Sequence, residues 1–238
     1  MWQLDGLSDA DVGTAMTFMR QQATGSDFLP LHQHRIVAIS VALRTGSSFR
    51  VWSLGDADAD EVELVRRFYD GIERYGPTLV SWNGGGFDLP VLHYRALKHG
   101  IQAPRYWETG DTDRDFRYNN YLGRFHWRHI DLMDVLAGFQ PRGRASLDQV
   151  ATLLGFPGKL GMSGADVWRC WLDGGIEAIR DYCETDVLNT YLVYLRFELM
   201  RGNLDAAGLD RELGLVRSSV AALARPHLDE FLAAWKQD

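Results

Sequence analysis

The sequence predicts an α/β fold, with a mixed sheet that is covered by helices on both faces. Two runs rich in β-branched and alternating apolar residues, 35–43 and 48–54, flank Thr45-Gly46-Ser47, which is the pattern of an antiparallel hairpin. Helical and strand patterns then alternate as far as residue 131, and only helical patterns follow residue 146.

The first half of the chain contains well-marked starts and stops. Ser8 stands before Asp9 and Asp11, so we predict that it caps a helix ending near residue 22. Gly76-Pro77 opens a short apolar strand. The predicted elements of this half are helix 8–22, strands 35–43 and 48–54, helix 60–75, strand 78–82 and helix 89–99.

The second half begins with a long segment, 100–124, that has little periodicity and many polar and aromatic residues. Loops of this length in compact domains are usually functional or mobile. The remaining predicted elements are a short strand at 125–130, helices capped by Ser146 and Ser163, a long helix at 175–200 and an amphipathic helix around 218–235. We predict three parts: a helical segment at 1–24, a domain at 25–202 and a helical extension at 203–238.

Composition sets limits on function. The 238 residues carry a net charge of −7, which argues against broad duplex binding through a basic surface but permits a grip on one strand end. No apolar run approaches the length of a membrane span, so we expect no membrane partner. The N-terminus lacks a charged-then-apolar leader, and we therefore expect a cytoplasmic location.

Residues 80–88, VSWNGGGFD, form the first candidate site. Three glycines allow the backbone to bend sharply and to lie close to another group. Asp88 stands where a helix begins, with Pro90 in its first turn. A carboxylate at the mouth of a strand can ligate a hard cation, but Asp in this position also caps helices, and the motif alone favours the cap.

Residues 176–187, IEAIRDYCETDV, form the second candidate site within the long helical pattern. Tyr182 and Asp186 are four residues apart and therefore share one helix face. A phenol and a carboxylate on one face can hold a water beside a metal, although a core tyrosine with an exposed aspartate gives the same spacing.

The pairing of Asn-x-x-x-Phe-Asp at 83–88 with Tyr-Cys-x-x-Asp-Val at 182–187 resembles the tyrosine-type branch of the DEDD superfamily of 3′–5′ exonucleases. The nearest resemblance is to predicted exonucleases related to the proofreading domain of B-family DNA polymerases. It runs from about residue 25 to residue 202 and includes 26–30 (SDFLP), 35–40 (RIVAIS), 129–134 (HIDLMD) and the residues around Lys159. The implied fold is ribonuclease-H-like.

The resemblance implies roles for six residues. Asp88 and Asp186 are expected to ligate two divalent ions, Mg²⁺ or Mn²⁺, which stabilise the attacking and leaving oxygens of a phosphodiester. Tyr182 is expected to orient the attacking water. Trp82, Asn83 and Phe87 are expected to shape the site and bind the substrate, a 3′ end of single-stranded DNA or RNA. The implied products are nucleoside 5′-monophosphates.

The sequence departs from this family at the first motif, Asp-x-Glu on the first strand. No Asp-x-Glu precedes residue 35, and Asp9-Ala10-Asp11 is the only nearby acidic pair. Those residues lie in the first turn of a predicted helix, where acids are expected from the helix dipole alone. We therefore expect that the natural start lies upstream, that the first strand is lacking, and that this chain is an impaired nuclease.

Three further groups have two interpretations each. His129 and Asp131 flank a strand end and could face the cleft or serve the structure. The aromatic residues of 100–124 could stack on bases or could pack the loop onto the core: Tyr106, Trp107, Phe116, Tyr118 and Tyr121. Arg142, Arg144 and Lys159 could contact phosphates or remain solvated.

Two other functions remain open at this stage. A chain without the first-motif acids could be a non-catalytic nucleic-acid-binding module of the same fold. The C-terminal helices could instead make the protein an interaction domain.

Overall fold

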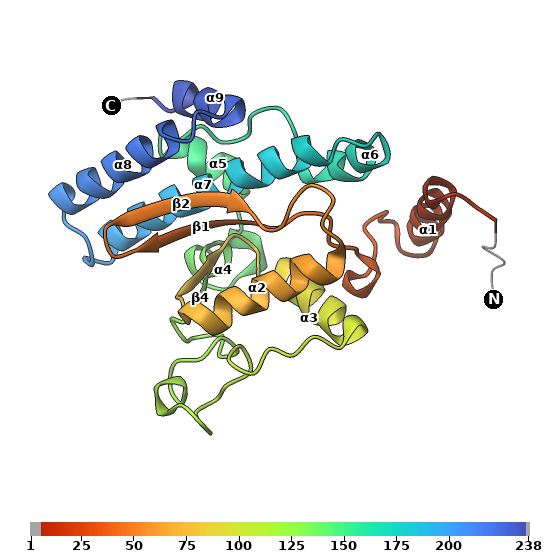
Figure 1. Ribbon diagram of the computed structural model, residues 1–238, viewed down its shortest axis with the longest axis horizontal. Helices are drawn as coiled ribbons and strands as arrows, with labels where there is room; N and C mark the ends of the chain where they lie inside the picture. The colour runs from red at the N-terminus through yellow and green to blue at the C-terminus, as the bar shows by residue number, and fades with distance from the viewer. Residues whose placement is uncertain (1–5, 237–238) are drawn as a thin grey trace.

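The computed structural model describes residues 6–236 and has an α/β architecture (Figure 1). Within these residues the strands form two separate two-stranded sheets. β1 (Ser40–Thr45) pairs with β2 (Ser48–Ser53) in antiparallel register, and β3 (Leu79–Ser81) pairs with β4 (His129–Asp131) in parallel register. Figure 1 shows helices on both sides of the β1–β2 hairpin, as the sequence predicts, but the two strand pairs do not join into one ladder.

The hairpin confirms the predicted turn at residues 45–48, where Thr45 pairs with Ser48. In β2 the side chains of Phe49 and Val51 are buried while Ser48 and Arg50 are exposed, which is the alternation of a strand with one face on the core. β1 begins five residues later than predicted. The N–H of Ile36 donates to a carboxylate oxygen of Glu61 at 2.7 Å, so this stretch is held by a side chain and not by a strand ladder.

α2 (Glu61–Tyr75) and α3 (Asp88–His99) confirm two predicted helices and form one layer with the segment that follows them. The Asp60 side chain caps α2 by accepting from the Glu63 N–H at 2.8 Å. A buried cluster joins both helices to the 100–124 segment through Tyr106, Phe116 and Tyr121. Three of the five aromatic residues of that segment therefore pack the core, whereas Trp107 and Tyr118 are exposed.

α7 (Ile176–Met200) is the central helix of the other layer and confirms the longest predicted element. It packs against β1, β2 and β3 on one side and against the C-terminal helices on the other. Its buried residues belong to the main core, with Phe49 and Val51 of β2 and Ile130 of β4. The helices around α7 are α4 (Leu132–Leu136), α5 (Leu147–Leu153), α6 (Val167–Leu172), α8 (Ala206–Ala221) and α9 (Pro226–Ala234).

The single helix predicted around 218–235 is wrong. The structure has α8, a turn at 222–225, and α9. Ala224 in the turn has φ 48°, and Pro226 opens α9, where a proline fits because its missing N–H would have no helical partner. The predicted strand at 125–130 is also shorter than expected, since β4 begins only at His129.

α1 (Asp9–Thr24) lies at the edge of the molecule, away from the hairpin (Figure 1). Ser8 caps it as predicted, and Gly25 ends it in the left-handed region with φ 75°. None of its residues is fully buried. Among residues 6–236, no helix combines the length and apolar character needed to cross a bilayer.

Candidate active site

The turn between β3 and α3 is held by the neighbouring strand. Asp131, at the end of β4, accepts the N–H of Asn83 with Oδ1 and the N–H of Gly85 with Oδ2, both at 2.9 Å. Asn83 adopts φ 63°, and its carbonyl accepts the N–H groups of Gly86 and Phe87 at 3.0 and 2.9 Å. Parallel pairing places both strand ends at the same edge, so Asp131 fixes the turn from which α3 starts.

The glycines of this turn are needed because neighbouring groups approach closely. A Cβ on Gly84 would lie 2.5 Å from Cβ of Ser81, and a Cβ on Gly86 would lie 2.5 Å from Oδ1 of Asn83. The left-handed conformation falls on Asn83 and not on a glycine. The prediction of a sharply bent, closely packed turn is confirmed by this geometry.

Asp88 is the first residue of α3, and its side chain does not cap the helix. The residue is exposed to solvent, yet protein atoms lie close around its carboxyl group. Burial raises the pKa of its carboxyl to about 6, with further increases from the negative charges of Asp131 and Asp186. Among the described residues, the charged groups that act on this carboxyl are carboxylates, so its negative charge is repelled by its neighbours.

Asp186 and Tyr182 reach the same place from one face of α7. Burial raises the pKa of Asp186, while the hydrogen bond from the Tyr182 phenol and the charge of Lys159 oppose that increase. Burial and the negative charge of Asp186 raise the pKa of Tyr182, so the phenol is protonated at neutral pH. Tyr182 can therefore hold a water by hydrogen bonds but is not itself a base at that pH.

Asp186 links the other two residues, because its negative charge raises the pKa of both Asp88 and Tyr182. Lys159 is exposed, and its positive charge is near enough to Asp186 to lower the pKa of that carboxyl. Arg144 instead forms an ion pair with Asp134 at 2.6 Å.

The acidic pair of α1 lies in the first turn of that helix. Asp11 accepts a hydrogen bond from the hydroxyl of Ser8, the residue that caps α1, at 2.6 Å. The carboxylate of Asp11 therefore belongs to the cap of this helix.

The three residues expected to bind substrate differ in their surroundings. Trp82 is half-buried against the main core, and its buried indole Nε1 has no hydrogen-bond partner among the described residues. The ring of Phe87 lies 5.2 Å from that of His34 and 5.7 Å from that of Phe28. Phe28, which is 54% exposed, and His34 were not singled out from the sequence, although Phe28 lies in the SDFLP segment.

His129 and Asp131 serve the structure of the site. The His129 Nε2 lies 2.9 Å from the Ser81 hydroxyl, across the β3–β4 pair. Burial lowers the pKa of His129, which favours the neutral imidazole. Both oxygens of Asp131 are occupied by backbone N–H groups. Of the two interpretations given for this pair, the contacts favour the structural one.

The fit of a metal ion can be judged from these carboxylates. Within residues 6–236 no group of three or more His, Cys, Asp or Glu side chains is arranged for metal binding. Asp88, which is exposed, and Asp186, which is half-buried, nevertheless carry like charges and have raised pKa values, and a hard cation would relieve this repulsion. The pair fits part of the coordination shell of one ion and not a complete two-ion site.

Comparison with known proteins gives a family and several relatives. Residues 26–235 match a family described as predicted 3′–5′ exonuclease related to the exonuclease domain of PolB. A DNA polymerase of Archaeoglobus fulgidus is 29% identical over 137 residues, which are 56% of this chain and 17% of the polymerase. A DNA polymerase of Pyrococcus glycovorans is 27% identical over 180 residues, or 71% of this chain and 23% of the polymerase.

A third relative is the catalytic polypeptide of DNA polymerase epsilon from Schizosaccharomyces pombe, which is 25% identical over 150 residues, or 59% of this chain and 6% of that polypeptide. In each case the matched region is less than a quarter of the polymerase. The family model, in contrast, covers the chain from the segment before the hairpin through the helix that follows α8. The chain therefore belongs to the family of predicted 3′–5′ exonucleases related to the exonuclease domain of PolB.

Proposed function

We propose that this protein is a metal-dependent 3′–5′ exonuclease that removes nucleoside 5′-monophosphates from the 3′ end of single-stranded nucleic acid. The observation that supports the proposal is that Asp186 of α7 is near enough to act on both Asp88 of α3 and Tyr182 of α7. Asp88 and Asp186 are 98 positions apart in the sequence. Membership of the family supports the reaction class.

Each residue has a proposed role that follows from its surroundings. Asp88 and Asp186 would hold a divalent ion, Mg²⁺ or Mn²⁺, which supplies charge stabilisation for the phosphodiester oxygens. Tyr182, protonated at neutral pH, orients the attacking water by hydrogen bonds. Asn83 shapes the turn beside Asp88, Phe87 and Trp82 offer apolar surface for the terminal nucleotide, and Lys159 is placed to attract its phosphate.

Two carboxylates are fewer than a two-ion site requires. Further carboxylates could come from an additional strand. β1 and β3 each pair with one strand among the described residues. Their residues are at best half-buried, although helices pack on both strands. A strand added between β1 and β3 would satisfy these edges. Such a strand, carrying the Asp-x-Glu of the first motif, would complete the acidic cluster.

The test is release of mononucleotides from labelled single-stranded DNA and RNA in Mg²⁺ or Mn²⁺. We expect weak activity that Asp186→Ala and Asp88→Ala abolish and that EDTA removes. Asp9→Ala/Asp11→Ala is the control, because these acids lie in the first turn of α1, and it should leave the activity unchanged. Activity that survives Asp186→Ala would refute the assignment.

A second candidate is a nucleic-acid-binding module without catalysis, favoured by the incomplete set of carboxylates within residues 6–236. The upstream coding sequence separates the two. An in-frame strand with Asp-x-Glu favours the enzyme, and its absence favours the binding module.

A further inference from the structure

The segment between α3 and β4 presents an unusual set of side chains to solvent. Tyr118 is 81% exposed, Phe125 73% and Trp127 46%, and the exposed Arg117 and Arg124 stand beside them. We call these five residues the loop surface. Residues 114–128 contain four arginines and one aspartate in a chain of net charge −7. Exposed rings interleaved with arginines are the combination that binds single-stranded nucleic acid without reading its sequence.

Two segments of the loop, one around Asn119 and the other around Trp127, are hydrogen-bonded to each other. The N–H of Trp127 donates to the Asn119 side-chain oxygen at 3.0 Å, and Nε of Arg128 donates to the Asn119 carbonyl at 2.6 Å. Tyr118 therefore directly precedes, in the sequence, the residue that holds Trp127 and Arg128. Arg124 lies 4.7 Å from the ring centre of Phe139, and the rings of Phe125 and Phe139 are 5.2 Å apart.

Buried aromatic packing and side-chain hydrogen bonds hold the backbone of the loop in place. The rings of Tyr106 and Tyr121 are stacked at 5.3 Å, Phe116 is fully buried, and the Tyr121 hydroxyl donates to the Pro77 carbonyl at 2.6 Å. The Asn120 side chain accepts the N–H groups of Leu122 and Gly123 at 3.1 and 2.9 Å. The exposed rings therefore stand on a packed base, and a ligand does not have to order them first.

The loop surface lies at the end of the β3–β4 pair opposite the candidate active site. Trp127 precedes β4, whereas Asp131 ends it beside Asn83. The guanidinium of Arg201, just after α7, lies 4.0 Å from the ring centre of Trp127. The four residues from Trp127 to Asp131 span at most about 14 Å, and α7 rises about 22 Å from Arg201 to Asp186, so the separation corresponds to about four to six stacked nucleotides at 3.4 Å each.

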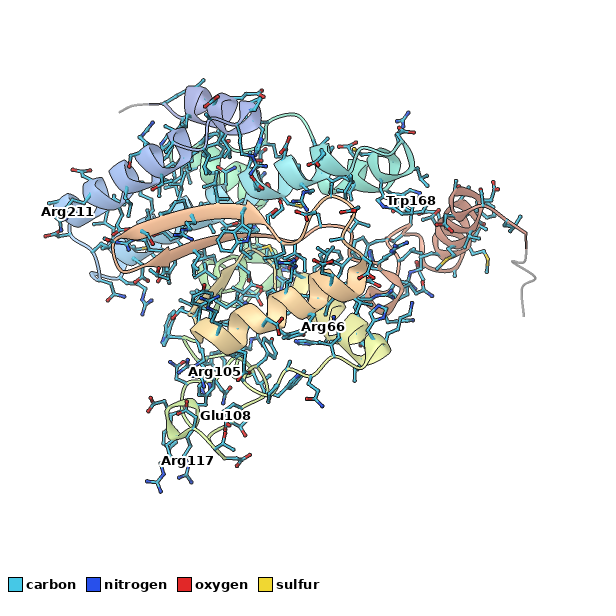
Figure 2. All side chains as sticks on the ribbon, in the orientation of Figure 1. Arg66, Arg105, Glu108, Arg117, Trp168 and Arg211 are labelled. Carbon is cyan, nitrogen blue, oxygen red and sulfur yellow. The ribbon has the colours of Figure 1, made fainter. Side chains whose placement is uncertain are left out.

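We propose that the loop surface binds the single strand about four to six nucleotides away from the end that enters the site of Asp88 and Asp186. This inference rests on the proposed function for the position of the strand end. Bases stack on Tyr118, Phe125 and Trp127, and Arg117 and Arg124 neutralise phosphates. Figure 2 shows Arg117 at the outer tip of the loop, far from Arg211 on α8 and from Arg66 on α2.

The experiment measures binding of labelled oligothymidylate and oligouridylate in EDTA, by fluorescence anisotropy. Probes of about 4 and about 12 nucleotides separate the site alone from site plus loop surface. We expect tighter binding of the longer probe, and Tyr118→Ala or Phe125→Ala should each weaken it by about 5-fold to 150-fold, the usual contribution of one stacked base. Neither variant should change the affinity for the short probe.

Matched controls are available in the chain. Phe18 on α1 is 63% exposed, so Phe18→Ala removes a similar ring from another surface. Arg117→Ala/Arg124→Ala should reduce the slope of log K against log salt by about 1.4, the value for two phosphate contacts on a single strand. Arg66→Ala/Arg211→Ala makes the same change in charge on other exposed positions and should leave the slope unchanged.

Equal affinity for the two probe lengths, or equal effects of Phe125→Ala and Phe18→Ala, would overturn the inference and would leave the surface to a protein partner. The failure of the proposed function has a different signature. If Asp186→Ala and wild type both fail to hydrolyse DNA while the length dependence persists, the loop surface stands and the exonuclease does not.

Discussion

Asp131 shows how one buried side chain determines the shape of the candidate site. It is 8% exposed, and its two carboxylate oxygens accept the backbone N–H groups that start the turn into α3. The sequence places Asp131 at a strand end and Asn83 at another, 48 residues earlier. Only the parallel pairing of β3 with β4 brings the carboxylate under the turn.

Asp131→Ala should therefore destabilise the protein. Asn83 is half-buried and Gly85 is exposed, so water can replace part of the lost hydrogen bonding, and the free energy of unfolding should fall by about 1–3 kcal/mol in total. Asp131→Asn keeps one acceptor oxygen and should lose about half as much. Chemical denaturation measures both. Equal stability of Asp131→Ala and wild type would mean that the turn does not depend on this carboxylate.

Asp88 predicts a pH dependence with a defined sign. Its pKa is about 6 in the folded protein and ~3.9 in an unfolded chain, so between these values the folded state binds more protons. Stability from this group therefore falls as pH rises through that window. In EDTA, Asp88→Asn should have the higher Tm at pH 7, by at most a few degrees because solvent reaches the side chain.

The difference between Asp88→Asn and wild type should shrink as the pH falls and vanish below about pH 3, where the wild-type carboxyl is protonated in both states. Added Mg²⁺ should raise the Tm of wild type more than that of the variant, since an ion that binds the folded state stabilises it. A variant less stable than wild type at pH 7 in EDTA would contradict the unbalanced charge that we assign to Asp88.

At the scale of elements, α7 is fixed by a buried carboxylate that faces away from the candidate site. Glu184 is fully buried, and its carboxylate accepts a hydrogen bond from the Ser53 hydroxyl of β2 at 2.9 Å. The same carboxylate contacts the Arg225 guanidinium at 2.8 Å and the His227 ring at 3.0 Å. The other ring nitrogen of His227 lies 3.0 Å from Asp181. This network ties α7 to β2 and to the start of α9, and it therefore sets the position of Asp186 two residues further along the helix.

Glu184→Ala should cost about 3–5 kcal/mol, because it leaves Arg225 and His227 facing an empty, partly buried position. For a chain of this length the loss corresponds to a Tm about 6–20 °C lower. The matched control is Glu63→Ala, which removes an exposed pair with Arg67 and should cost no more than about 0.5 kcal/mol. Similar Tm values for the two variants would show that the network does not hold α7.

At the scale of the whole molecule, both strand pairs pack against α7, but among the described residues no backbone hydrogen-bond ladder joins one pair to the other. α7 packs on β1, β2 and β3, while α2 and α3 cover the opposite layer. Among the described residues, the two strand pairs are therefore joined through the packing of α7 and not through backbone hydrogen bonds between them. Unpaired strand edges of this kind favour association with other strands.

A chain extended by its upstream coding residues should be more stable than the chain of 238 residues if those residues supply a strand between β1 and β3. We expect a higher Tm, a monodisperse profile in size-exclusion chromatography and stronger nuclease activity. The reason is that one strand would pair with the edges of β1 and β3 and would also add carboxylates to those of Asp88 and Asp186. Equal Tm, solubility and activity for the two proteins would show that the proposed strand is not needed.

The sequence determined the elements whose signals are local. Ser8 and Ser146 cap helices as predicted, and Thr45-Gly46-Ser47 turns the hairpin, because each signal acts through hydrogen bonds within a few residues. The two motifs also identified the family and the residues from which the candidate site is proposed.

Only the tertiary structure decided what depends on residues far apart in the chain. It divided the aromatic residues of the 100–124 loop into a buried base with Tyr106 and an exposed surface with Tyr118. It interrupted the C-terminal helical pattern at residues 222–225, where Arg225 reaches Glu184 on α7. Periodicity reports which residues share a face of an element, but burial and long-range ion pairs depend on which elements meet.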